Sequence, residues 1–289
     1  MDRRHVVTES MVGRTVRLLR YFGEFGLARG GALLAKPYAV RLVGGEIFSL
    51  TIGTGRRVWL RATSSDIRVF DQIFVHREYA IDAMPHTAAL RSRLAAAIAS
   101  GRPPVILDCG ANIGLSALWF AWTFPQASIY AIEPHPANFD LLQRNVAKVP
   151  NIVPVQGAVW GRSRRVMIVD PEAEAWAFRI RETSGSTDTE GIPAFTIDDL
   201  LARAGSDAPL IAKIDVEGAE AEIFSNGTTW LDKAQLVIIE LHDWMMPWVG
   251  TSRSFLRAIS QYPFDCVIRG ESLFCFHHAL RPKAAESAS

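Results

Sequence analysis

The strongest constraint on the fold is a regular alternation of short apolar runs and helical patterns after residue 104. Four of these runs are V-I-L-D (105–108), I-Y-A-I-E (129–133), L-I-A-K-I-D-V (210–216) and L-V-I-I-E-L-H (236–242). Short apolar runs separated by helices are typical of a parallel sheet that is covered on both faces. The sequence therefore predicts an α/β fold with a doubly wound, mostly parallel sheet.

The segments at both ends of this alternation complete the predicted organisation. F-D-C-V-I-R (264–269) and S-L-F-C-F (272–276) predict a closing antiparallel pair, so the last strand is expected to be antiparallel. Pro103 and Pro104 mark a boundary. We expect an N-terminal α+β extension at 1–102, with a basic amphipathic helix, a β-hairpin within 39–61 and further helices. A Rossmann-like domain follows at 103–281, and 282–289 form a tail.

Composition and charge narrow the classes of partner. The chain has 31 basic and 30 acidic side chains, whereas proteins that bind nucleic acid usually carry a basic excess. We therefore expect a small-molecule partner and no nucleic acid. No apolar run reaches the roughly 18 residues of a membrane span, so no integral membrane segment is predicted. Three cysteines without a CxxC pair favour a reducing compartment, the cytoplasm. The extension is expected to form a cap, the arm of a homodimer, or both.

The loop D-C-G-A-N-I-G (108–114) joins a predicted strand to a predicted helix. Open α/β sheets bind ligands at this edge, and Gly110 and Gly114 allow a close approach of the backbone. The loop lacks the middle glycine of the G-x-G-x-x-G dinucleotide motif. An acid at Asp108 disfavours a pyrophosphate but suits an amine and a sulfonium. We therefore favour S-adenosylmethionine as the cofactor over NAD, and an NAD-dependent oxidoreductase remains the alternative.

The ends of the next two predicted strands extend this pocket. Glu133 is placed to accept hydrogen bonds from both ribose hydroxyls, and Pro134 fixes the turn after it. The segment Q-G-A (156–158) offers small residues and backbone amides to an adenine. The complete predicted cofactor-binding set is Asp108, Gly110, Ala111, Asn112, Gly114, Glu133, Pro134, Gln156, Gly157, Ala158 and Asp215.

Alternating polar residues on two later strands indicate the place of the chemistry. Lys213, Asp215 and Glu217 share one face of their strand, and Glu240 and His242 do the same on the next strand. His242 is the predicted general base, since histidine titrates near pH 6.5. We expect Asp215 to orient His242 or to face the cofactor, and Glu217 to bind the acceptor hydroxyl. Lys213 is interpreted as a paired, structural lysine.

A metal mechanism remains an alternative from the same residues. Asp215, Glu217, Glu240 and His242 are oxygen and nitrogen donors that can gather around Mg²⁺, which acidifies a bound hydroxyl. Spacing does not show whether they converge, so no metal ligand is assigned. The polar segment 171–193 is predicted to be a loop or lid, and Trp244 to Trp248 to form a wall of the acceptor pocket.

Four motifs together resemble the FkbM family of methyltransferases. These are D-C-G-A-N-I-G-L-S-A, I-E-P-H-P-A-N-F, K-I-D-V-E-G-A-E and I-E-L-H, and the resemblance extends from Ser64 to Phe276. It implies S-adenosylmethionine-dependent O-methylation of a sugar, polyketide or other secondary metabolite. It also implies that Asp108, Gly110, Asn112, Gly114 and Glu133 hold the cofactor. A non-catalytic cofactor-binding module and, less so, a nucleic-acid methyltransferase remain alternatives.

Overall fold

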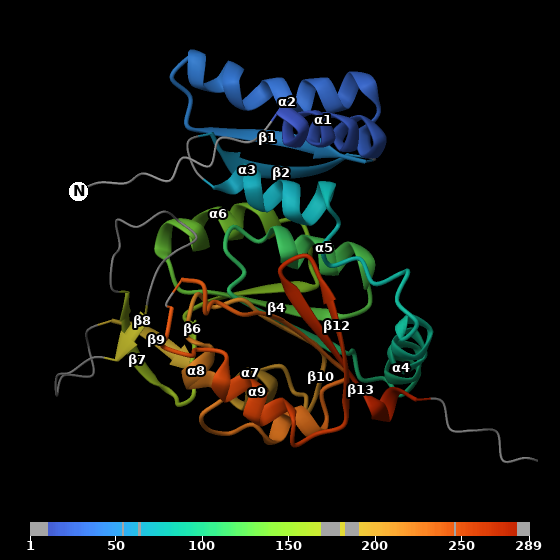
Figure 1. The fold of residues 1–289 in the computed structure, drawn as a ribbon, viewed down its shortest axis with the longest axis vertical. Helices are drawn as coiled ribbons and strands as arrows, with labels where there is room; N and C mark the ends of the chain where they lie inside the picture. The colour runs from blue at the N-terminus through green and yellow to red at the C-terminus, as the bar shows by residue number, and fades with distance from the viewer. Residues whose placement is uncertain are drawn as a thin grey trace, which may run out of the picture. The chain divides into compact units, whose positions relative to one another are not determined.

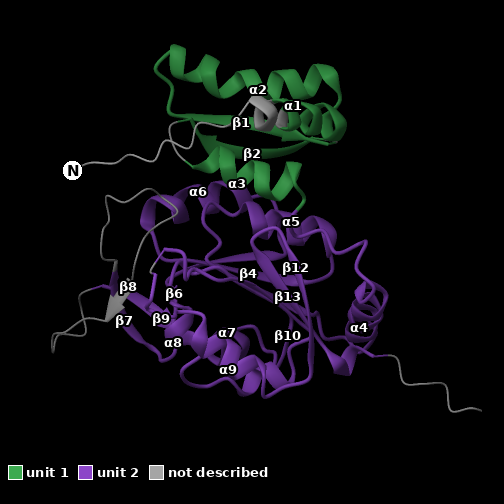
Figure 2. Cartoon of the chain, viewed as in Figure 1, with its two compact units in different colours: residues 1–77 green, residues 78–289 purple. Residues whose placement is uncertain are grey.

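The computed structural model describes residues 11–53, 55–62, 65–168, 180–182, 191–245 and 247–281. The chain divides into two compact units, residues 1–77 and 78–289 (Figure 2). Helix α4 (Thr87–Ala99), which we expected in the N-terminal extension, therefore groups with the large sheet. No helix in the described part of the chain is long and apolar enough to cross a membrane.

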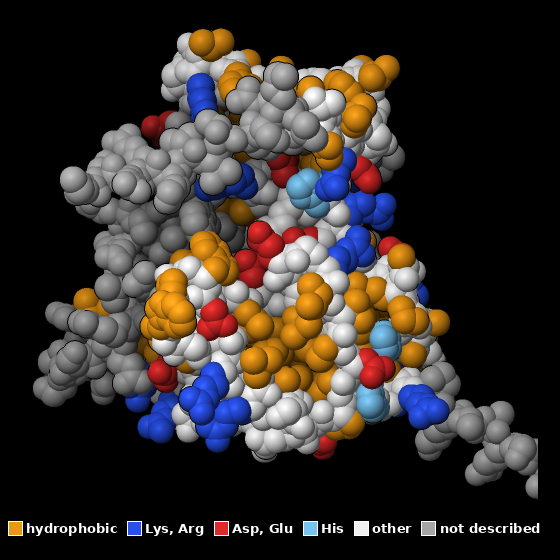
Figure 3. Space-filling view, viewed as in Figure 1, with side chains coloured by type: hydrophobic (Ala, Val, Ile, Leu, Met, Phe, Trp, Pro, Cys, Tyr) orange, Lys and Arg blue, Asp and Glu red, His pale blue; other side chains and the backbone are white. Residues whose placement is uncertain are grey.

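Unit 1 consists of two helices, a hairpin and a third helical segment (Figure 1). Its elements are α1 (Met11–Phe25), α2 (Leu27–Leu42), β1 (Ile47–Ile52), β2 (Arg56–Arg61), α3 (Asp66–Phe70) and the π-helix η1 (Asp71–Val75). The expected hairpin exists, but residues 39–42 belong to α2 rather than to a strand. They continue a helix that buries Gly30, Leu33 and Pro37 at helical spacing. The space-filling view shows apolar side chains on the surface of this unit (Figure 3). Leu19, Leu27 and Leu42 are exposed.

The large sheet of unit 2 has the order β12-β13-β11-β10-β3-β4-β5. Its strands are β3 (Val105–Cys109), β4 (Ser128–Glu133), β5 (Ile152–Gln156), β10 (Pro209–Ile214), β11 (Leu236–Glu240), β12 (Phe264–Arg269) and β13 (Ser272–His277). The run from β11 to β5 is parallel, while β13 is antiparallel to β11 and to β12. The predicted Rossmann-like sheet with an antiparallel end is confirmed.

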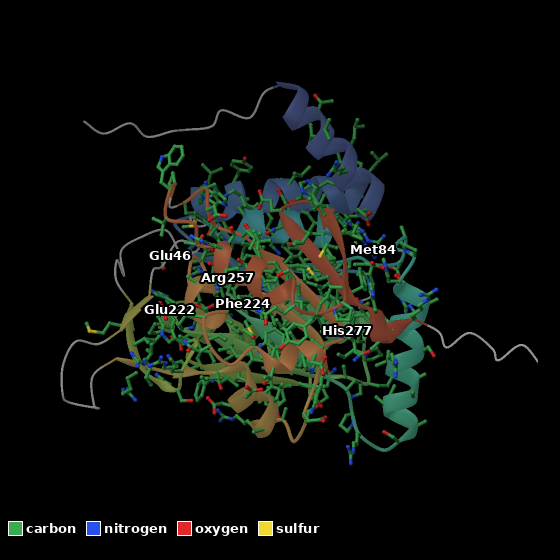
Figure 4. All side chains as sticks on the ribbon, turned by 60° about the horizontal axis from the view of Figure 1, so that its bottom comes forward. Glu46, Met84, Glu222, Phe224, Arg257 and His277 are labelled. Atoms are coloured by element: carbon green, nitrogen blue, oxygen red, sulfur yellow. The ribbon has the colours of Figure 1, made fainter. Side chains whose placement is uncertain are left out.

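Helices cover both faces of this sheet (Figure 1). They are α5 (Leu115–Thr123) and α6 (Pro136–Val146) on one face, and α7 (Ile197–Arg203), α8 (Glu220–Ile223) and α9 (Arg253–Ile259) on the other. Short 3-10 turns follow at η2 (Thr229–Asp232) and η3 (His278–Leu280). Thr196 and Asp199 form a capping box that starts α7. Phe224, labelled in Figure 4, packs edge-on against Phe255 and so joins α8 to α9.

The predicted strand 152–159 divides at Gly157 into two strands of different sheets. Residues 158–159 form β6 (Ala158–Val159) in a small sheet with β7 (Arg164–Ile168), β8 (Ile180–Glu182) and β9 (Ile192–Phe195). A Cβ atom at Gly157 would lie 2.7 Å from the carbonyl oxygen of Pro193, so glycine permits the crossing. Strands β8 and β9 also interrupt the segment 171–193, which we expected to be a loop. The rest of that segment and the tail after residue 281 lie outside the described residues.

Candidate active site

The loop after β3 is shaped by two glycines with left-handed backbone conformations. Gly110 has φ 81°, and a Cβ atom there would lie 1.7 Å from the carbonyl oxygen of Asp215. Gly114 has φ 84° and caps the start of α5. The backbone N–H of Asp215 donates to the carbonyl oxygen of Cys109 at 3.1 Å. Side chains other than hydrogen do not fit at Gly110, so the loop lies directly against the residue that follows β10.

Asp108, at the strand end before this loop, is fully buried and paired. Its Oδ2 accepts a hydrogen bond from Ser116 at 2.6 Å, and its Oδ1 lies 3.2 Å from Nζ of Lys213. Lys213 also donates to the carbonyl oxygen of Gly110 at 2.7 Å and lies 3.3 Å from Oδ2 of Asp215. Burial lowers the pKa of Lys213, but the neighbouring carboxylates of Asp108 and Asp215 outweigh it and raise that pKa well above the usual value. The expected free acid that repels a diphosphate is thus neutralised by Lys213, which is the paired lysine that the sequence predicts.

Glu133 organises the opposite side of the loop. Its Oε2 accepts from the backbone N–H of Asn112 at 2.8 Å, and its Oε1 from that of His135 at 2.9 Å. Burial raises the pKa of Glu133 to about 7, although these backbone hydrogen bonds act in the opposite direction. Asn112 has φ 50°, and its buried Oδ1 has no hydrogen-bond donor among the described residues.

The remaining cofactor candidates lie around these side chains. The backbone N–H groups of Gly110 and Ala111 both donate to the carbonyl oxygen of Ile132, and that of Gly157 donates to the carbonyl oxygen of Glu133. Gln156 is exposed, whereas Ala158 is fully buried. The ends of β3, β4 and β5 therefore meet at one edge of the sheet, as predicted.

A cluster of acids surrounds the buried imidazole of His242. Ile214 of β10 and Ile239 of β11 are paired in register, which brings Asp215 and Glu240 side by side. The His242 side chain is 1% exposed. Its Nε2 lies 3.5 Å from Oδ1 of Asp215, 3.6 Å from Oε2 of Glu217 and 3.6 Å from Oε1 of Glu240. Asp215 and His242 thus lie side by side, as predicted, and Glu217 and Glu240 converge on the same imidazole, which the spacing had left open.

Glu220, which was not among the predicted site residues, makes the shortest contact of the cluster. Its Oε1 lies 2.5 Å from Nδ1 of His242, so Glu220 rather than Asp215 orients the imidazole through this nitrogen. The signal was present in K-I-D-V-E-G-A-E, where Glu220 stands three residues after Glu217 and begins α8. Glu217 itself has φ 52°, a conformation that is costly for a residue other than glycine and that concentrates at functional sites.

The electrostatics of the cluster follow from its crowding. Burial lowers the pKa of His242, but the hydrogen bond to Glu220 and the charge of Asp215 outweigh it and raise that pKa to about 9. Burial, followed by the charge of Asp215, raises the pKa of both Glu217 and Glu240. The cluster by itself therefore retains protons near neutral pH, and His242 is then an imidazolium rather than a free base.

The aromatic segment after β11 lies at the edge of this cluster. The ring of Trp244 is 6.4 Å from that of His242, and Trp244 is 61% exposed. Trp248 is fully exposed, and Met246 lies outside the described residues. Oδ1 of Asp243 accepts hydrogen bonds from Thr251 and Ser252, which hold this segment as a loop. Trp244 is thus accessible to a ligand next to His242.

A family model, the methyltransferase FkbM domain, matches residues 108–263. The match begins at Asp108 and includes both the glycine loop and the acidic cluster. The chain belongs to the FkbM methyltransferase family. Membership of this family agrees with the FkbM resemblance of the motifs, and the sheet is the doubly wound, mostly parallel sheet predicted from the strand pattern.

Relatives of this FkbM methyltransferase include two whose names refer to methylation of sugars or at a 2-O position. The chain is 29% identical over 139 residues to the hexuronic acid methyltransferase AglP of Haloferax volcanii, covering 48% of this chain and 56% of AglP. It is 24% identical over 183 residues to the 2-O-methyltransferase NoeI of Sinorhizobium fredii, covering 58% of this chain and 75% of NoeI. The chain thus spans little more than half of AglP.

Among solved structures, the chain is similar to the methyltransferase FkbM of Methylobacillus flagellatus. The two are 18% identical, with a TM-score of 0.43, and the likeness covers 61% of this chain and 44% of the other.

Proposed function

We propose that this FkbM methyltransferase transfers the methyl group of S-adenosylmethionine to a hydroxyl oxygen of a sugar or a related small acceptor. The names of AglP and NoeI, a hexuronic acid methyltransferase and a 2-O-methyltransferase, support this acceptor class. The proposal rests chiefly on one juxtaposition. Nζ of Lys213 contacts both the carbonyl oxygen of Gly110 and the carboxylate of Asp215, so the glycine loop and the acidic cluster adjoin.

The residues around the glycine loop fit a cationic nucleoside. Asn112 Oδ1 is a buried acceptor without a donor among the described residues, which suits an amine, and the Glu133 carboxylate suits ribose hydroxyls. Gly110 and Gly157 are packed directly against the backbone of Asp215 and Pro193, so the space beside these glycines is filled by the protein and not left for the ligand. Lys213 lies between the carboxyl groups of Asp108 and Asp215, of which Asp108 is fully buried and Asp215 is partly exposed. When bound, S-adenosylmethionine supplies a methyl group on positively charged sulfur, and an acceptor oxygen displaces that sulfur in line.

The side chains of the acidic cluster can hold an acceptor hydroxyl and take up its proton. A hydroxyl must be held close to the methyl carbon and must lose its proton during the attack. We place the acceptor hydroxyl beside His242, Asp215 and Glu217, with the exposed ring of Trp244 as an apolar surface for the acceptor. Aromatic rings of this kind pack well against the apolar faces of ligands.

The test combines binding and transfer. Calorimetry with S-adenosylmethionine is expected to show one site per chain, and Glu133→Ala is expected to weaken binding. Transfer of a labelled methyl group to hexuronic acids and neutral hexoses is then followed by mass spectrometry. Tight binding of NADH with no binding of S-adenosylmethionine would refute the proposal. Cofactor binding without transfer to any hydroxylated acceptor would instead support a non-catalytic module.

A further inference from the structure

Three donor atoms of the acidic cluster have the arrangement of a metal-binding group. One oxygen each of Asp215 and Glu240 and one nitrogen of His242 all lie within 4.8 Å of one another. In an octahedral Mg²⁺ site with bonds of about 2.1 Å, neighbouring donors are about 3 Å apart and opposite donors about 4.2 Å apart. The Nε2 distances of 3.5 Å and 3.6 Å to Asp215 and Glu240 need a contraction of only about half an ångström to match neighbouring positions.

Two further observations point to a ligand at the same place. The buried imidazole of His242 is fixed through Nδ1 by Glu220, so that Nε2 faces the carboxylates. A carboxylate on the second nitrogen is the usual partner of a metal-ligating histidine. In addition, Oε2 of Glu217, 3.6 Å from Nε2, is buried and has no hydrogen-bond donor among the described residues. Orphaned buried acceptors of this kind are rare and indicate a missing partner.

A cation can replace the protons that the cluster otherwise retains. When all five carboxyl groups of Asp108, Asp215, Glu217, Glu220 and Glu240 are ionised, they contact two cationic side chains among the described residues, Lys213 and His242. S-adenosylmethionine, with an ammonium, a sulfonium and a carboxylate, adds a single net positive charge. Two negative charges then remain uncompensated in a partly buried site, where unpaired charge is costly. A divalent cation balances them.

We infer that Asp215, Glu240 and His242 bind a divalent cation, with Glu220 as the residue that positions His242. One imidazole nitrogen and two carboxylates suit a first-row ion such as Mn²⁺ better than Mg²⁺, which prefers oxygen alone. This inference rests on the proposed function and deepens it, because the acceptor hydroxyl is then held and acidified by the cation. It replaces the base role expected for His242 with that of a ligand.

In the methyl-transfer step, Glu217 accepts the proton of the acceptor hydroxyl. The O–H bond of the acceptor breaks, and its proton passes to the Glu217 carboxylate. The oxygen forms a bond to the methyl carbon while the carbon–sulfur bond breaks, and the electron pair of that bond stays on sulfur as a neutral thioether. No oxidant or reductant is required.

The experiment titrates metal-free protein with Mn²⁺ and follows free Mn²⁺ by electron paramagnetic resonance, a signal independent of activity. We expect one site per chain and at least tenfold weaker binding in Asp215→Asn and Glu240→Gln. Glu220→Gln should weaken binding about 10- to 100-fold, as loss of a carboxylate behind a ligating histidine usually does. Asp207→Asn is the matched control, because Asp207 is exposed and precedes β10 whereas Asp215 follows it. Thermal unfolding confirms that each variant folds.

The outcomes separate this inference from the proposed function. Absence of Mn²⁺ binding to the folded wild type, with or without S-adenosylmethionine, would overturn it. Wild-type Mn²⁺ affinity in both Asp215→Asn and Glu240→Gln would do the same. Full methyl transfer in the presence of a strong chelator would support the proposed methyltransferase activity and contradict the cation site. The opposite result is also possible: both variants lose Mn²⁺ binding, but calorimetry shows no binding of S-adenosylmethionine to the protein. That result would support the cation site and contradict the cofactor assignment.

Discussion

Replacing Gly110 by alanine tests whether the glycine loop (108–114) and the residue after β10, Asp215, are in direct backbone contact. Two costs are expected. An L-residue at φ 81° costs about 1–2 kcal/mol. The new Cβ atom would also lie 1.7 Å from the Asp215 carbonyl oxygen, where real Cβ contacts are essentially never below 3.0 Å. The backbone after β10 must therefore shift by roughly an ångström, and overpacking of this kind costs about 1–3 kcal/mol.

Gly101→Ala is the matched control for this substitution. Gly101 also has a left-handed backbone, with φ 74°, but a Cβ atom there meets nothing within 4 Å. The difference between the two variants isolates the contact with Asp215. In a protein of this size 1 kcal/mol corresponds to about 2–4 °C in Tm, so Gly110→Ala should melt at least about 4 °C below Gly101→Ala if the contact costs about 2 kcal/mol.

Differential scanning calorimetry measures the melting temperatures, and isothermal titration measures the affinity for S-adenosylmethionine. We expect only Gly110→Ala to lose cofactor affinity. Equal melting temperatures and equal affinities in the two variants would show that the loop and the strand are not in the described contact.

Four further predictions concern buried charges and the thiol pair. Cofactor affinity should fall below pH 7, by at most about tenfold per pH unit, since burial raises the pKa of Glu133 to about 7 and its carboxylate is a stronger acceptor for ribose hydroxyls than the protonated acid; titration calorimetry of Glu133→Gln should show no such dependence. Because the pKa of Glu133 in the folded protein is above its ordinary value of 4.5, its contribution to the free energy of unfolding is largest below pH 4.5. That contribution is lost as pH rises through 7. Lys213→Met should lower the free energy of unfolding by about 3–5 kcal/mol by leaving Asp108 buried and unpaired, and adding Asp108→Asn should recover part of it in denaturant titrations. Cys266, whose pKa is lowered by its contact with Cys275 at 3.3 Å, should alkylate before the buried Cys275, and equal rates by mass spectrometry would contradict this.

The sequence predicts the sheet well because burial dictates its residues directly. The strands β3 and β10 are buried at every position, and such continuous apolar runs have few other interpretations. Division of the strand at Gly157 is harder to predict, because it depends on the distant segment near Pro193. The helical state of residues 39–42 likewise depends on packing of α2, which overrides their local β propensity.

Most members of the candidate site were predictable, whereas Glu220 and the charges of the site were not. Alternation along two strands is enough to bring Asp215 and His242 together, because the strands are parallel neighbours. That Lys213 neutralises Asp108, and that Glu220 rather than Asp215 holds Nδ1 of His242, depend on contacts between elements. Spacing along the chain carries no information about such distances. The proton state of the cluster follows from these same contacts and so required the structure.

The absence of a side chain at Gly110 restricts how this enzyme can diversify. A larger residue there displaces the backbone of Asp215, directly after β10, so the glycine loop and this backbone can only change together. Adaptation to another acceptor must therefore come from segments that are tied less closely to this contact. The exposed aromatic loop around Trp244 is such a segment, since it follows β11 and Asp243 binds Thr251 and Ser252 at its base. If this loop contacts the acceptor as we propose, substitutions of its exposed side chains can change acceptor preference while Gly110 and Asp215 stay unchanged.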